Sequence, residues 1–156
     1  RYVGAMRKTL IGTALATAAA AAVGSATSRD GIEGWYANIR KPSYVPPNAV
    51  FPIAWTALYV DIAATSAAAI NRFRADGNDE KARAYIGALG ANLVLNAGWS
   101  WIFFGKHRLA LSAAAAGLLT ASSADLGIAT FFLAGVVNCY VIGKINVVAS
   151  EIFSRD

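Results

Sequence analysis

The chain has 156 residues, of which 56% are hydrophobic and 15% are charged. A soluble globular domain is nearer a quarter charged, and a chain of this length suits a single domain over residues 1–156. The lone Cys139 excludes an internal disulfide, and the lone His107 leaves no cluster for structural zinc. The net charge of +5 is spread between apolar runs, so we expect contacts with lipid headgroups and no nucleic-acid binding.

The first uncharged apolar run covers residues 9–28, and its 20 residues would span about 30 Å as a helix, enough to cross a bilayer core. Alanine and glycine dominate the run, which favours close packing against other helices. The basic residues before it and the small residues 24–27 also resemble a signal peptide with its cleavage site. We favour a retained first helix.

A polar connector is expected at residues 29–41, where Trp35 and Tyr36 suit a membrane interface. Proline cannot continue a helix beyond its first turn, so the proline-rich segment that follows should be an extended loop. It holds three prolines within six residues: Pro42, Pro46 and Pro47.

Two further apolar runs, residues 49–73 and 84–105, predict a second and a third membrane helix joined by a solvated loop. Residues 109–153 are long enough for two more spans. We prefer a fourth helix at about 109–128 and a fifth at about 134–153, because a turn at residues 122–125 would leave the fourth too short. The sequence therefore predicts an all-α membrane protein, a bundle of five transmembrane helices.

Four residues of the third segment share one helix face, because Asn92, Asn96, Trp99 and Phe103 are spaced four, three and four residues apart. Two side-chain amides in hydrocarbon are unfavourable without hydrogen bonds, so this face should point into the bundle. It could act as interhelical glue or as a pocket wall, with amides that orient a ligand and rings that stack on it. The spacing does not choose between them.

The second segment carries an aromatic stripe, and stripes of this kind more often pack than bind: Phe51, Trp55, Leu58, Tyr59 and Ile62. Asp61, inside the same segment, is a functional-site hypothesis by default; a salt bridge to Lys144 or a protonated carboxyl explains it equally well. The sequence has no nucleophile–base pair, phosphate-binding glycine loop or metal-ligand spacing. We therefore expect no catalytic residues, no metal site and no enzyme activity.

Three motifs are distinctive. Residues 35–47 read WYANIRKPSYVPP, residues 51–59 read FPIAWTALY, and residues 96–105 read NAGWSWIFFG. Together they resemble the translocator protein / tryptophan-rich sensory protein family, also called the peripheral benzodiazepine receptor family. The resemblance covers about two thirds of the chain. It implies five helices, frequent homodimers, and a pocket for porphyrins, haem-related tetrapyrroles and sterol-like ligands such as cholesterol.

The resemblance also implies site residues. Position by position, Tyr36, Trp55 and Asn96 would line the pocket, and Pro46 and Pro47 would shape the loop that covers it. With the polar face of the third segment, the expected ligand-binding residues are Tyr36, Pro46, Pro47, Trp55, Asn92, Asn96, Trp99 and Phe103. No cofactor is required on this interpretation, because a porphyrin or haem-like molecule would be the ligand.

The fifth segment departs from the family pattern, since residues 139–143 read CYVIG where the family has P-Y-x-x-W. Two main hypotheses follow for this protein of a bacterial or mitochondrial membrane. It is a tetrapyrrole- or sterol-binding sensor, regulator or carrier, or it is a structural subunit of a larger membrane complex with a degraded pocket. Light-dependent oxidation of tetrapyrroles ranks last, because no acid–base constellation supports it.

Overall fold

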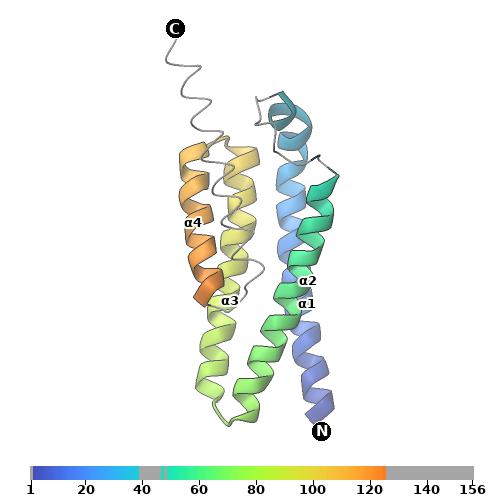
Figure 1. Ribbon diagram of the computed structural model, residues 1–156, viewed down its shortest axis with the longest axis vertical. Helices are drawn as coiled ribbons and strands as arrows, with labels where there is room; N and C mark the ends of the chain where they lie inside the picture. Colours follow the sequence, from blue (N-terminus) through green and yellow to red (C-terminus); the bar gives the residue numbers. More distant parts are fainter. Residues whose placement is uncertain (1, 39–46, 48, 126–156) are drawn as a thin grey trace.

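The computed structural model describes residues 2–38, 47 and 49–125, and every element within them is helical. Four long helices run alternately up and down along the bundle, and the short π-helical turns η1 and η2 continue the first and third of them (Figure 1). The elements in chain order are α1 (Tyr2–Gly31), η1 (Ile32–Tyr36), α2 (Val50–Ala75), α3 (Asp79–Ser100), η2 (Trp101–Gly105) and α4 (Leu109–Asp125).

Three helical stretches are long and apolar enough to cross a membrane: Val3–Tyr36, Pro52–Ala75 and Asp79–Gly105. The expected all-helical membrane architecture is thus confirmed for the described residues. The fifth helix stays a prediction, because residues 126–156 lie outside the described part of the chain. The alternative of a turn at residues 122–125 is wrong, since α4 is helical through Asp125.

The first helix is longer than its uncharged run. It begins at Tyr2, and η1 carries the helical path on to Tyr36. Trp35 and Tyr36 therefore lie on a helix rather than in the expected polar connector. The sequence explains this, because no proline occurs before Pro42 and charged side chains are tolerated where a helix leaves the hydrocarbon. Since α1 contacts α2, α3 and η2, the first segment is part of the bundle.

The connection between α2 and α3 is a tight turn of residues 76–78, shorter than the expected solvated loop. Gly77 adopts a φ of 70°, the left-handed conformation that commonly ends a helix. The Asn78 side chain then accepts a hydrogen bond from the backbone N–H of Lys81 at 3.1 Å and caps α3. Hydrogen bonding of the turn residues allows both helices to extend past the apolar runs.

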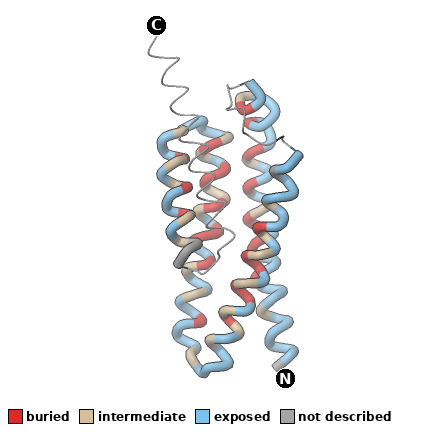
Figure 2. The backbone as a smooth tube through the Cα atoms, in the orientation of Figure 1, coloured by how far each residue is buried: buried red, intermediate tan, exposed pale blue. Residues whose placement is uncertain are grey.

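The buried residues lie on the inward faces of the helices, and the first turns of α1 are exposed (Figure 2). One core cluster joins all four long helices through Ala20, Leu58, Ile62, Leu89, Leu93 and Leu119. Small residues bring α1 close to its neighbours. A Cβ on Gly24 would lie 3.3 Å from the Ser100 Oγ atom, and one on Gly31 would lie 2.9 Å from the carbonyl carbon of Phe104.

Candidate functional site

Rings from four elements converge in one region, which we call the aromatic cluster. Its members come from η1, α2, α3 and η2: Trp35, Tyr36, Trp55, Tyr59, Trp99, Phe103 and Phe104. Within it, Trp99 and Phe103 stack nearly parallel, with ring centroids 5.2 Å apart and an interplanar angle of 8°. The π-helical turn η2 positions Phe103 and Phe104 against both Trp99 and Tyr36.

The two stripes expected on the second and third segments meet in this cluster. The Trp55 ring of α2 lies 6.3 Å from the Trp99 ring of α3 and 6.0 Å from the Tyr59 ring. One turn deeper in the bundle, the Tyr59 hydroxyl donates a hydrogen bond of 2.7 Å to the Asn96 Oδ1 atom. The aromatic rings of α2 and α3 and the Asn96 amide therefore pack into one continuous, largely buried group. The Phe51 side chain lies outside the described residues.

The polar face of α3 points into the bundle as expected. Asn92 is fully buried, and Asn96, Trp99 and Phe103 are at most 5% exposed. Asn92 joins α3 to α4, because its Nδ2 atom donates to the Ser122 Oγ atom at 2.6 Å. Together with the Tyr59–Asn96 bond, this hydrogen bond confirms that both amides link helices. Their ligand-binding role stays a prediction.

Asn96 retains one further hydrogen-bonding group. Its Oδ1 atom accepts from Tyr59, whereas its buried Nδ2 atom has no acceptor among the described residues. A buried amide donor of this kind calls for a partner such as water or a ligand. Since Tyr59 fixes the amide orientation, the direction of this donor beside the aromatic cluster is set.

Trp99 is held on a second side by α4. Its indole N–H donates to the Ser112 carbonyl oxygen at 3.1 Å, and Ser112 is fully buried. Neither Ser112 nor Ser122 belongs to the helix faces expected from the sequence. Small polar residues in an otherwise apolar helix were the available signal, because hydroxyls in a membrane bundle commonly face other helices.

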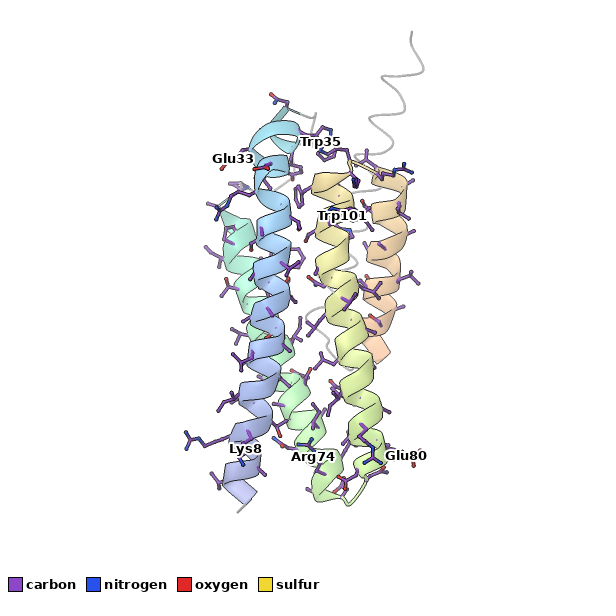
Figure 3. The ribbon with its side chains drawn as sticks, turned by 180° about the vertical axis from the view of Figure 1, so that it is seen from behind. Lys8, Glu33, Trp35, Arg74, Glu80 and Trp101 are labelled. Atoms are coloured by element: carbon purple, nitrogen blue, oxygen red, sulfur yellow. The ribbon has the colours of Figure 1, made fainter. Side chains whose placement is uncertain are left out.

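The π-helical turn η1 supplies Trp35 and Tyr36. Tyr36 is 7% exposed, and its ring lies 6.2 Å from that of Phe103 and 5.7 Å from that of Phe104. Trp35, near one end of the bundle (Figure 3), stacks on the His107 ring with centroids 4.4 Å apart. Tyr36 thus joins the aromatic cluster, and its expected ligand-binding role stays a prediction. Trp35 and Phe104 join the same cluster although they were not among the expected site residues.

Several other residues of interest from the sequence lie outside the described part of the chain or make other contacts. Pro46 and Lys144 lie outside the described residues, as do residues 139–143. Pro47 is exposed, and its carbonyl oxygen accepts from the backbone N–H of Val50 at 2.9 Å, next to the start of α2. Asp61 is half-buried on α2 and accepts a hydrogen bond from the Thr65 hydroxyl at 3.2 Å.

Comparison with known proteins agrees with this arrangement. Residues 12–143 match the profile of the TspO/MBR family. The chain belongs to the TspO/MBR family. The resemblance expected from the motifs is confirmed, and with it a multi-pass membrane protein.

Individual relatives of the family match shorter stretches. The chain is 40% identical over 76 residues to the Rhodobacter capsulatus protein CrtK, covering 49% of this chain and 46% of that protein. It is 38% identical over 80 residues to the Cereibacter sphaeroides tryptophan-rich sensory protein, covering 51% and 46%. An Archaeoglobus fulgidus tryptophan-rich protein TspO is 36% identical over 98 residues, covering 62% and 60%. The matches span about half the length of the first two relatives. Because both of these relatives are bacterial, they support a location in a bacterial membrane.

Proposed function

We propose that this protein is a membrane sensor or regulator that binds a tetrapyrrole, such as a porphyrin or a haem-like molecule, at the aromatic cluster. Family membership and the name of the Cereibacter sphaeroides relative, tryptophan-rich sensory protein, support a sensory role. The observation that carries the ligand class is Asn96, whose buried amide donor lies beside a surface of aromatic rings.

A tetrapyrrole matches this surface chemically. Its flat, apolar macrocycle offers a face to stack on Trp55, the half-buried ring at the edge of the cluster, in the offset or edge-on geometries that aromatic groups prefer. Its carboxylates and carbonyl groups are acceptors for an amide N–H such as the Asn96 Nδ2 donor. A mostly aromatic lining with few polar groups is the usual composition of a small-molecule site. A sterol-like ligand would use the same apolar surface but would leave most of the ring stacking unused.

Trp55 gives the sharpest test of the site, because it is half-buried at the edge of the cluster and contacts both Tyr59 and Trp99. Trp55→Ala should weaken protoporphyrin IX binding about fivefold, since stacking on one large ring contributes on the order of 1 kcal/mol beyond area burial. The measurement is a fluorescence titration of the purified full chain in lipid nanodiscs.

Trp101→Ala is the matched control. Trp101 is 49% exposed and is not a member of the aromatic cluster. The Lys106 ammonium lies 5.0 Å from the centroid of the Trp101 ring. Replacement of Trp101 should leave the titration unchanged. Equal affinities for native chain and a folded Trp55→Ala variant would count against the aromatic cluster as the site, and so would equal losses in the two variants.

A further inference from the structure

A groove opens between α1, α2 and α3, away from the aromatic cluster. Its volume is about 530 Å³, within the range of small-molecule sites. Its walls are mostly apolar, and include Ile70 of α2 and Leu93 of α3. Two cations also line it, Lys8 of α1 and Arg74 of α2, and both lie at the end of the bundle opposite Trp35 (Figure 3).

Two glycines give the groove its width. Gly12 lines it on α1 and Gly90 lines it on α3. A Cβ added at either position would meet no heavy atom within 4 Å, so a larger side chain there would enter the groove rather than collide with its walls. From Lys8 to Ala16 the α1 axis rises about 12 Å. The groove therefore extends from headgroup level into the hydrocarbon region.

The charged end of the groove favours an anion. Arg74 of α2 is hydrogen-bonded to α1, because its Nη1 atom donates to the Thr9 Oγ1 atom at 3.1 Å. In the described part of the chain, no carboxylate lies within ion-pair distance of Lys8 or Arg74, and none of the groove's lining residues is acidic. The nearby Asp76 pairs with Arg72 instead, at 3.1 Å. The remaining guanidinium donors are suited to a phosphate group.

We propose that this groove binds one anionic phospholipid, with its phosphate at Lys8 and Arg74 and one acyl chain between Gly12 and Gly90. A small soluble anion would use the cations but not the apolar walls. A neutral amphiphile would use the walls but not the cations. An anionic phospholipid matches both features and their order along the membrane normal, since the cations lie at the helix ends and the apolar walls lie deeper.

The acyl-chain part is tested by filling the groove. Native mass spectrometry of the full chain, from micelles with equal dioleoyl phosphatidylglycerol and dioleoyl phosphatidylcholine, should show one preferentially retained phosphatidylglycerol. Gly90→Leu should weaken that retention about tenfold, equivalent to losing contact with about two methylene groups. Gly87→Leu is the matched control, because Gly87 also has open space around it on α3 but does not line the groove.

The headgroup part is tested by removing charge. Lys8→Gln and Arg74→Gln should each reduce the preference for phosphatidylglycerol over phosphatidylcholine about fivefold, because a basic residue near an anionic lipid contributes on the order of 1 kcal/mol. Arg83→Gln removes an exposed cation of the same α2–α3 end that does not line the groove, and should leave the preference unchanged.

Three results would overturn the proposal. The native chain could retain both lipids equally, Gly90→Leu could behave like Gly87→Leu, or the two cation variants could match Arg83→Gln. If Gly90→Leu changed the oligomeric state while lipid retention stayed the same, a second copy of the chain would be the occupant instead. Gly12→Leu, on the opposite wall, repeats the test should the Gly90→Leu chain fail to fold.

Discussion

Trp99→Ala should destabilise the folded bundle by about 3 kcal/mol, the low end of the range for deleting a buried tryptophan. The ring is 5% exposed, stacks on Phe103 at 5.2 Å, and donates its indole N–H to the Ser112 carbonyl at 3.1 Å. The low end applies because the ring stays in an apolar medium when a membrane helix separates from its neighbours, so lost packing rather than transfer to water sets the effect.

Equilibrium unfolding in mixed micelles with increasing dodecyl sulfate measures this effect. Trp101→Ala controls for removal of a tryptophan from the same helix end and should change the free energy of unfolding by less than about 1 kcal/mol, since Trp101 is 49% exposed. Similar losses for the two variants would mean that the stacked and hydrogen-bonded position of Trp99 does not support the bundle.

Gly31→Ala should also destabilise the bundle, by about 1–3 kcal/mol, because it inserts a methyl group where no space exists. An ideal Cβ at this position would lie 2.8 Å from the Phe104 Cβ atom and 2.9 Å from the Phe104 carbonyl carbon. These atoms belong to the π-helical turn that positions the aromatic cluster. The helices α1 and α3 would have to separate, so porphyrin binding should weaken together with stability.

Gly34→Ala is the matched control for that variant and should act in the opposite direction. Gly34 lies one turn further on in η1, and a Cβ there meets no atom within 4 Å. Alanine in place of an unconstrained helical glycine stabilises by roughly 0.4–1 kcal/mol, through the smaller entropy of the unfolded chain. If both variants were more stable than the native chain in the same unfolding assay, that result would contradict the close packing of Gly31 against Phe104.

The inward direction of Asn92, Asn96, Trp99 and Phe103 could be predicted from sequence because it depends only on helical periodicity and on the high free energy of an unpaired amide in hydrocarbon. Both arguments are local to one helix. The family could also be predicted, because its motifs consist of contiguous residues, and the match over residues 12–143 confirms it.

Partners across helices could not be predicted in the same way. The Tyr59–Asn96 and Asn92–Ser122 hydrogen bonds depend on the register of α2 and α4 against α3. That register is set by side-chain packing across the bundle, and periodicity within one helix does not contain it. Helix ends were also misjudged. The cap at Asn78 and the π-helical turn ending at Tyr36 extend two helices into polar sequence, where hydropathy predicts loops.

Tetrapyrrole binding by this protein can be measured by titrating the purified native chain with protoporphyrin IX in nanodiscs of defined lipid. We expect saturable binding at one porphyrin per chain, quenching of tryptophan fluorescence, and competition by other flat tetrapyrroles. A folded chain that shows no saturable binding, and that copurifies with other membrane proteins in fixed proportion, would contradict the sensor proposal and favour a structural subunit.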